Sequence, residues 1–496
     1  MSKRLPVDDR ALFRLAVLLV AAITLIRIIV LLVTPLQLYP DEAQYWWWAQ
    51  NVDWGYFSKP PLIAWIIWLT TRVSDAEWAI RLASPLLHAG TALLLFRIGR
   101  LSYDVRVGFW SALAYATLPG ISYSSGLIST DVPLLFCWAV ALYTFLRARA
   151  DLGWGWPVLC GVALGFGLLA KYAMFYFVLG AVVAALVEPR ARRLVFSTRG
   201  CLILALGLLI LSPNLIWNAA HGWPTLAHTE ANANWSHARY SITNASEFIV
   251  GQLGVFGPLM MTGWIAALWR LRPAEHRDSR GRILAAFSAP VLILVTMQSF
   301  ISEANANWAA PAYIAAVPLA VDTLLRWWHA RALWLSLALG TAAMLALWIA
   351  TVDPALAERV GEGNALKRQE GWRELGEAVV SESHRTSYDA IAAANRSVLA
   401  ELLYYARPRG VPIRAWDASA IPRDHFQMTM PLTPAFRHVL LVLYPDDAPR
   451  VIASFDSHSP VKQLSIPLGR RRTRVLSIYD AEGFHVPQHP HQPGLK

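Results

Sequence analysis

Charged residues are scarce in this chain, and cysteines are scarcer still. Only 16% of its 496 residues are Asp, Glu, Lys or Arg, whereas soluble domains carry about 25%. The three cysteines, Cys137, Cys160 and Cys201, all fall inside apolar stretches, which excludes a disulfide framework. Because 56% of the residues are hydrophobic, the sequence indicates a polytopic membrane protein and not a soluble enzyme.

The apolar stretches predict about eleven membrane-spanning helices, although several are shorter than the ~20 residues that a full span needs. The first stretch is long and lacks a small-residue cleavage site, so we interpret it as an anchor and not as a signal peptide. The predicted spans are 11–34, 80–97, 107–126, 131–147, 155–170, 172–187, 201–217, 248–269, 283–300, 309–325 and 332–350.

Arginines crowd every second loop between these spans, which places those loops and the N-terminus in the cytoplasm. The loops assigned to the outside contain only Lys59, Arg72 and Arg239 as basic residues, and Lys171 lies at the outer end of a predicted span. An odd number of spans then places residues 351–496 on the outer side of the membrane. Most of the net charge of +11 is therefore a topology signal, and we expect no nucleic-acid partner. The expected location is the inner membrane of a bacterium, with the tail periplasmic.

The sequence predicts a membrane domain over 1–350, with a long first outer loop over 35–79. A small α/β domain is expected over 351–484, because helical and strand patterns alternate there. The last residues, 485–496, are rich in proline and histidine and are expected to be disordered. The expected elements of the first loop and the tail are helices at 41–50, 61–73, 372–380 and 397–406, and strands at 389–394, 411–416, 438–444, 461–466 and 474–478.

Two carboxylates follow the first apolar stretch, in the run Tyr39-Pro40-Asp41-Glu42. The same aromatic-rich loop continues to Tyr56, Lys59 and two prolines. Carboxylates beside a lysine and several aromatic rings suit a site for an anionic, ring-containing substrate at the membrane face. The alternative is structural, since Asp41 or Glu42 can simply begin a helix.

Four motifs together resemble the GT-C glycosyltransferases that use polyprenyl-phosphate sugars, and most of all the bacterial family 39 and aminoarabinose-transferase members. The motifs are Tyr-Pro-Asp-Glu at 39–42, Ser-Lys-Pro-Pro at 58–61, Ser-Thr-Asp-Val-Pro at 129–133 and Ala-Lys-Tyr at 170–172. The resemblance implies an all-α polytopic domain of GT-C type with a C-terminal extracytoplasmic domain. It also implies an enzyme that moves a sugar from a polyprenyl-phosphate donor to a glycolipid or protein acceptor.

The resemblance implies roles for the charged residues of these motifs. Asp41 is expected to be the general base that takes the acceptor's proton, supported by Asp131 and Glu42. Lys59 and Lys171 are expected to bind the donor phosphate. The structural alternatives are a helix-capping role for Asp131 and interfacial snorkelling for the two lysines, although an intramembrane lysine is by default a functional hypothesis.

The remaining candidates are expected to contact the substrates. Glu230 and Glu303 begin two identical hexapeptides, Glu-Ala-Asn-Ala-Asn-Trp, both assigned to the outer side. His228 and Glu230 could be acceptor contacts or metal ligands, but two residues at this spacing are a weak metal signature. In the aminoarabinose transferases that this chain resembles, an acidic residue that helps to bind a metal stands where this chain has Ser58, which argues against a similar metal site. No cofactor is expected to be required, and a divalent metal remains the less favoured alternative. The candidate substrate-binding residues are Lys59, Lys171, Tyr39, Tyr56, Tyr172, His228, Glu230 and Glu303.

Two other protein classes fit the membrane pattern less well. A transporter or lipid flippase places charges at the bilayer midplane and often contains inverted repeats, whereas here the charges gather at one face. A non-catalytic subunit of an envelope complex would need Asp41 and Lys59 only as structural residues. The sequence leaves open which sugar and which acceptor are used.

Overall fold

The computed structural model describes residues 8–235, 240–271, 279–359, 366–407, 410–419, 421–469 and 472–486. The chain forms two compact units. The first contains Met1–Val33 and Lys59–Trp348, and the second contains Thr34–Ser58 and Ile349–Lys496. The segment that carries Asp41 therefore clusters with the C-terminal residues, and the segment that begins at Lys59 clusters with the helices.

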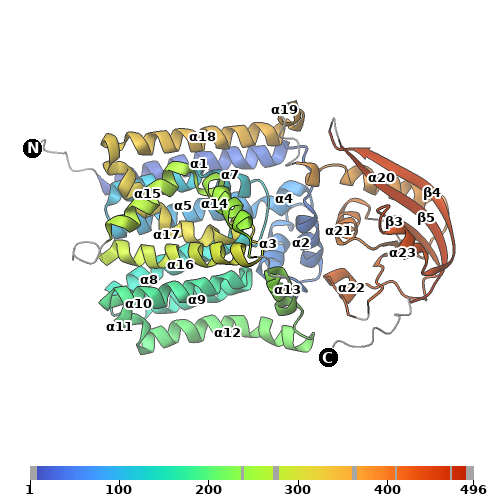
Figure 1. Cartoon of the computed structure of the whole chain (residues 1–496), viewed down its shortest axis with the longest axis horizontal. Helices are drawn as coiled ribbons and strands as arrows, with labels where there is room; N and C mark the ends of the chain where they lie inside the picture. The colour runs from blue at the N-terminus through green and yellow to red at the C-terminus, as the bar shows by residue number, and fades with distance from the viewer. Residues whose placement is uncertain are drawn as a thin grey trace, which may run out of the picture. The chain divides into compact units, whose positions relative to one another are not determined.

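The regular elements among the described residues of the first unit are all helices, and the long ones run alongside one another (Figure 1). Short 3₁₀ turns connect some of them, at Tyr172–Met174, Ala306–Ala309 and Trp327–Ala330. The helices are α1 (Asp9–Val33), α3 (Leu62–Thr70), α4 (Glu77–Arg81), α5 (Ala83–Ser102), α6 (Val105–Thr117), α7 (Pro119–Ser124), α8 (Asp131–Ala150), α9 (Gly155–Ala170), α10 (Phe175–Val187), α11 (Pro189–Val195), α12 (Thr198–Ala220), α13 (Pro224–Ala233), α14 (Ile242–Phe256), α15 (Pro258–Arg270), α16 (Ser279–Ile301), α17 (Ala310–Arg326) and α18 (Arg331–Val352).

Seven helices of the described chain are long and apolar enough to cross a membrane. The number is eight if α14 and α15, which are bent by 105°, count as one broken span. The other predicted spans contain the shorter helices α6, α9 and α10. The polytopic, mostly helical architecture is thus confirmed, whereas the count of eleven spans stays a prediction.

Small residues set how closely neighbouring helices pack. A Cβ atom on Gly99 of α5 would lie 2.9 Å from the Cα of Gly108 on α6, and one on Gly165 of α9 would lie 2.6 Å from the Cβ of Ile210 on α12. Close approach at glycine is typical of helix packing in membranes, where van der Waals contact replaces the hydrophobic effect. The helix pairs α5–α6 and α9–α12 are therefore fixed by these positions.

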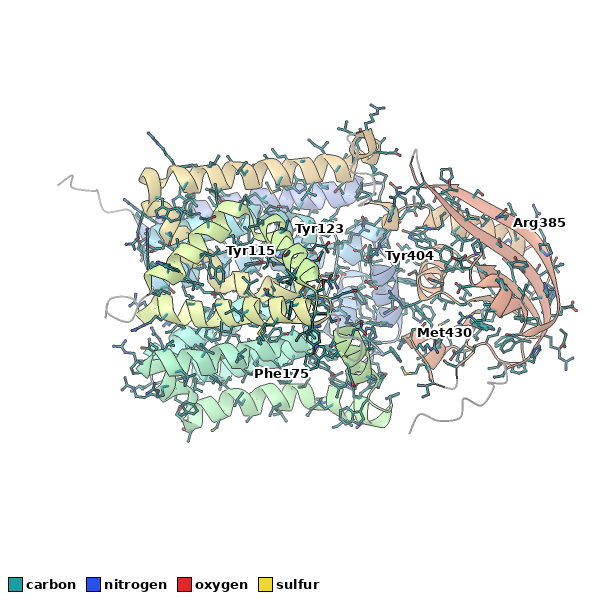
Figure 2. The ribbon with its side chains drawn as sticks, viewed as in Figure 1. Tyr115, Tyr123, Phe175, Arg385, Tyr404 and Met430 are labelled. Atoms are coloured by element: carbon teal, nitrogen blue, oxygen red, sulfur yellow. The ribbon has the colours of Figure 1, made fainter. Side chains whose placement is uncertain are left out.

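A buried polar network ties α1, α5, α6 and α7 together. Arg27 of α1 is only 3% exposed and donates a hydrogen bond of 2.6 Å to the Ala116 carbonyl near the end of α6. The His88 ring of α5 contacts the Tyr115 hydroxyl at 2.9 Å and the Ser124 hydroxyl of α7 at 3.0 Å. Figure 2 labels Tyr115 on this network. Since α7 leads directly into the loop before α8, the network positions that loop.

The second unit is a small α/β domain, as predicted. Its mixed five-stranded sheet has the order β2-β1-β3-β5-β4, with β1 parallel to β2 and β3, and β5 antiparallel to β3 and β4. The elements are α2 (Pro40–Gln50), α19 (Pro354–Arg359), a 3₁₀ turn (Lys367–Gln369), α20 (Trp372–Ser383), β1 (Ala390–Ala393), α21 (Arg396–Tyr405), β2 (Ile413–Ala415), α22 (His425–Thr429), β3 (His438–Leu443), α23 (Ala448–Ile452), β4 (Phe455–Pro467) and β5 (Thr473–Phe484).

Helix α2 is part of this domain although it is more than 300 residues distant in sequence. It packs against α21, where the rings of Trp46 and Tyr404 meet edge to face with centroids 4.9 Å apart. Tyr404 is labelled on α21 in Figure 2. The guanidinium of Arg407 lies over both rings, at 4.7 and 4.5 Å from their centroids. Aromatic and cation–π contacts of this kind bury large areas with a defined geometry, so they hold α2 in one orientation.

The predicted helices and strands of the first loop and the tail are confirmed, with β4 and β5 longer than expected because they form a hairpin. The predicted disordered segment lies largely outside the described residues, which end at Val486. Arg239, one of the predicted outer cations, also lies outside them.

Candidate active site

Asp41 lies in the first turn of α2, which begins at Pro40 after the extended residue Tyr39. Its Oδ1 atom accepts a hydrogen bond of 2.8 Å from Nη1 of Arg396, and the same Nη1 donates to Oε1 of Gln44 at 2.8 Å. The side chains of Asp41 and Arg396 are 42% and 40% exposed. A pair that is this exposed can exchange partners with an incoming ligand.

Arg396 is the first residue of α21, and its position is set by a helix cap. The Asn395 side chain accepts the N–H groups of Ser397 and Val398, at 2.9 and 3.4 Å, which satisfies two donors at the helix start. Burial lowers the pKa of Arg396, but the Asp41 carboxylate together with Tyr45 and Asp424 outweighs this effect, so the net pKa is raised. The arginine therefore stays charged beside Asp41.

Glu42 is buried, with 1% of its surface exposed. One of its carboxylate oxygens accepts the backbone N–H of Tyr39 at 2.9 Å. A carboxylate that reaches back from the third helical position is a capping interaction. The structural alternative for this acidic pair therefore applies to Glu42, while Asp41 directs its carboxylate to Arg396.

The two candidate substrate-binding tyrosines of the first loop, Tyr39 and Tyr56, are engaged within the second unit. The Tyr39 hydroxyl accepts a hydrogen bond from Arg368. The Tyr56 ring stacks on Trp48 with centroids 4.5 Å apart, and its hydroxyl donates to the Trp48 carbonyl at 3.1 Å. Tyr56 is only 2% exposed. Its contacts hold the end of α2 against the chain that follows.

Asp131, Lys171 and Asn307 form a polar cluster in the first unit. Nζ of Lys171 donates to Oδ1 of Asp131 at 2.7 Å, and Nδ2 of Asn307 donates to Oδ2 at 2.6 Å. The side chains of Asp131 and Lys171 are 10% and 20% exposed. The sequence offered Asp131 as a supporting catalytic residue, with helix capping as the structural alternative. In the structure its two oxygens accept hydrogen bonds from Lys171, directly after α9, and from Asn307 in the turn before α17.

Lys171 terminates α9 in an extended conformation and precedes the short turn at Tyr172. The Tyr172 hydroxyl donates to Oδ1 of Asn214 on α12 at 2.7 Å and accepts from Asn218 at 3.4 Å. The break between α9 and α10 is therefore fixed by hydrogen bonds on both sides. Lys59, by contrast, is half-buried and lies in the loop before α3.

The two hexapeptides are joined by one side chain, Gln298 of α16. Its Nε2 donates to the Ala233 carbonyl of the first copy at 2.9 Å and to the Glu303 carbonyl of the second at 3.3 Å. Its Oε1 accepts from the Trp235 indole at 2.6 Å. The repeat thus has a structural role, and its second copy also supplies Asn307 to Asp131.

The acidic side chains of the hexapeptides are exposed. Glu230 lies on α13 together with the half-buried His228, and Glu303 lies in the turn after α16. Across the described residues, no three His, Cys, Asp or Glu side chains gather in a way that could hold a metal ion. His228 and Glu230 therefore have no third candidate metal ligand beside them among the described residues.

The structure pairs Asp131 with Lys171, whereas Asp41 and Lys59 belong to different compact units. Sequence reasoning missed Arg396, Gln298 and Asn307. The repeated hexapeptide was a usable signal for Asn307, because it marked that segment as unusual. Nothing in the sequence distinguishes Arg396 from the other arginines of the tail.

The chain is similar to characterised glycosyltransferases along most of its length. It is 34% identical to the lipid A galacturonosyltransferase RgtD of Rhizobium johnstonii over 469 residues, which cover 94% of this chain and 98% of that one. It is 28% identical over 208 residues to the lipopolysaccharide core galacturonosyltransferase RgtB of the same organism, which is 40% of this chain and 41% of RgtB. Residues 58–217 match the dolichyl-phosphate-mannose-protein mannosyltransferase family.

The fold is also similar to that of a solved membrane enzyme. Crystal structures of ArnT from Cupriavidus metallidurans, in the apo state and bound to undecaprenyl phosphate, superpose with TM-scores of 0.65 and 0.64 at 17% and 16% identity. They cover 94% and 93% of this chain, and 97% of ArnT in each case. The architecture is that of a GT-C membrane glycosyltransferase.

The 34% identity to RgtD over 94% of the chain shows that this protein belongs to the ArnT-like GT-C glycosyltransferases. These enzymes take their sugar from a polyprenyl-phosphate donor. It is therefore a multi-pass enzyme of the bacterial inner membrane. This identification confirms the enzyme class predicted from the four sequence motifs and excludes the transporter and non-catalytic interpretations as its main role.

Proposed function

We propose that this enzyme transfers a galacturonosyl residue from a polyprenyl-phosphate donor to lipid A or a related lipopolysaccharide acceptor. The observation that carries the proposal is the 34% identity to a lipid A galacturonosyltransferase over 94% of the chain. The second relative in the same class acts on the lipopolysaccharide core, so the acceptor proposed for this chain is an envelope glycolipid and not a protein.

In this proposal Asp41 is the general base. It lies at the start of α2, is 42% exposed and presents its carboxylate beside a cation. The acceptor hydroxyl attacks the anomeric carbon of the donor sugar and loses its proton to Asp41, while the bond from that carbon to the phosphate oxygen breaks. The lipid phosphate leaves as an anion, which cations must stabilise. Glu42, which caps the helix, positions Asp41 and does not touch the reacting atoms.

Lys59 and Lys171 are the proposed ligands of that phosphate. Among the described residues Nζ of Lys171 donates to Asp131 alone, so two of its three N–H donors are open to a ligand. Asp131 is then a positioning residue, because it and Asn307 fix where the ammonium points. Tyr172 holds the adjoining turn, and His228, Glu230 and Glu303 remain candidates for acceptor contacts.

The proposal places the reaction on the periplasmic face. The support is the uneven loop charge, with arginines crowded into alternate loops, which the positive-inside rule assigns to the cytoplasm. A reporter enzyme that is active only in the periplasm, fused after residue 400, is expected to be active. Cytoplasmic activity of the fusion would contradict both the orientation and the assignment of the outer residues.

The test of the function is a reconstituted transfer reaction. The purified enzyme in lipid nanodiscs receives polyprenyl-phosphate galacturonate and lipid A, and mass spectrometry follows the acceptor. We expect lipid A to gain one hexuronic acid residue, and the same species to disappear from the envelope of a strain that lacks the gene. If lipid A and lipopolysaccharide core both stay unmodified while another acceptor is glycosylated, the proposed acceptor is wrong.

A further inference from the structure

The ion pair at Asp41 uses only part of its arginine. A guanidinium has five N–H donors arranged in a planar fork, and Arg396 donates its hydrogen bonds to Asp41 and Gln44 through Nη1 alone. Within the described residues, Nη2 and Nε of this side chain donate no hydrogen bond. The side chain is 40% exposed, so a ligand can reach the outer edge of the fork.

That outer edge has the geometry that binds a carboxylate. Two parallel N–H groups of an arginine match the two oxygens of a carboxylate, in a bidentate contact that lysine cannot reproduce. A galacturonosyl donor differs from a galactosyl donor by a carboxylate in place of a hydroxymethyl group. An enzyme that selects the uronyl sugar therefore needs a cation beside the sugar as well as cations at the phosphate.

The position of Arg396 suits that task. An acceptor oxygen bound by Asp41 lies ~3 Å from the carboxylate, and the anomeric carbon that it attacks lies ~3–3.5 Å further on. The sugar ring therefore lies within a few ångströms of Asp41, and Arg396 contacts Asp41 at 2.8 Å. Other arginines of this unit, such as Arg368 and Arg407, lie on aromatic rings of Tyr39, Trp46 and Tyr404.

The local charge balance changes during the reaction in a way that favours a second anion. Asp424 also faces Arg396, but its carboxylate caps α22 by accepting the N–H groups of Phe426 and Gln427 at 2.8 and 2.9 Å. When Asp41 takes the acceptor's proton, Arg396 loses its main counter-charge. A sugar carboxylate on the outer edge would keep the arginine paired at that moment.

We propose that Arg396 is the residue that selects a uronyl sugar, by binding its carboxylate with Nη2 and Nε while Nη1 holds Asp41. This inference rests on the proposed galacturonosyl transfer and assigns the C-terminal domain a direct part in donor recognition. Arg396 thus links the identity of the sugar to the residue that activates the acceptor.

The experiment compares two donors on the same enzyme preparation: polyprenyl-phosphate galacturonate and polyprenyl-phosphate galactose. The measured quantity is the ratio of their kcat/KM values, which is independent of the fraction of folded enzyme. We expect the wild type to prefer the uronyl donor, and Arg396→Gln to lose roughly 10- to 100-fold of that preference. Arg396→Lys should recover only part of it, because the planar fork is missing.

A matched control removes a charge elsewhere in the same domain. The control is Arg385→Gln. Arg385 is exposed, lies just after the end of α20 and pairs with Glu382. In this variant the donor ratio should stay at the wild-type value. An additional donor, the neutral galacturonamide, tests the wild type without any substitution and should behave like the galactosyl donor.

The outcomes separate this inference from the function on which it rests. If Arg396→Gln slows both donors equally, Arg396 only positions Asp41 and the selection role is wrong. If the wild type transfers both sugars without preference, the inference fails while glycosyl transfer stands. If the wild type transfers neither sugar to lipid A or to lipopolysaccharide core, the proposed function fails and the inference fails with it.

Discussion

Asp131 and Asp41 are both first-turn carboxylates paired with a cation, at 2.7 and 2.8 Å, yet their surroundings differ. The Asp131 side chain is 10% exposed and both of its oxygens are bound, by Lys171 and Asn307. The Asp41 side chain is 42% exposed. A buried and fully bound carboxylate holds its neighbours in place, whereas an exposed one can take a proton. This difference supports the proposal in which Asp131 positions its neighbours and Asp41 acts as the base.

The largest effect is expected from Asp41→Asn, which keeps the size and shape of the side chain but cannot accept a proton. Turnover should fall by roughly 10²–10⁴-fold, as for loss of a general base, with donor binding nearly unchanged. Single-turnover transfer and equilibrium binding of the donor lipid measure the two quantities. Transfer at the wild-type rate would exclude Asp41 as the base and remove the contrast with Asp131.

Lys171→Ala should weaken both donor binding and stability. It removes the proposed contact to the phosphate, worth about 1.5–3 kcal/mol. It also leaves Asp131 without its cation, and breaking a buried pair costs about 3–5 kcal/mol. Because Asp131 is not fully buried, we expect the loss of stability to lie at the lower end of the range of about 3–5 kcal/mol. Lipid titration and thermal unfolding provide the measurements.

The matched variant is Asp131→Asn, which removes the negative charge and leaves the lysine. It should reduce donor affinity less than Lys171→Ala does, because Lys171, the proposed phosphate ligand, remains. If Asp131→Asn instead stops turnover with binding intact, Asp131 acts as a base and the assignment of support is wrong.

Lys59→Ala should weaken donor binding without a comparable loss of stability, because Lys59 is half-buried in a loop. The expected loss is at the lower end of about 1.5–3 kcal/mol. Arg72→Ala is the control, since this exposed cation lies over the Trp68 ring, 4.2 Å from its centroid, in the same segment. Equal losses in both variants would mean that general surface charge, and not Lys59, attracts the lipid.

The smallest effect is expected from Gln298→Ala. It removes the bridge between the hexapeptides, so the free energy of unfolding should fall by about 1 kcal/mol. Thermal unfolding with a parallel transfer assay is the measurement. A strong loss of activity at normal stability would show that the hexapeptides do more than fix the turn that bears Asn307.

The sequence by itself determined the class of protein and most of its elements. Scarce charge and long apolar stretches dictated a helical membrane protein, because unpaired backbone groups cannot be left in lipid. Alternating patterns in the tail predicted its strands, and the motifs around Asp41, Lys59, Asp131 and Lys171 identified the enzyme family. These signals are local, and each is contained within a few consecutive residues.

Only the tertiary structure decided which side chains meet. Arg396 reaches Asp41 across 355 positions of the chain, and Asn307 reaches Asp131 across 176. The tertiary structure also grouped residues 34–58 with the C-terminal domain. Such contacts depend on how helices pack, and no pattern of neighbouring residues encodes them. The sequence therefore offered Asp41 as a candidate base, but the cation that accompanies it became visible only when the chain was folded.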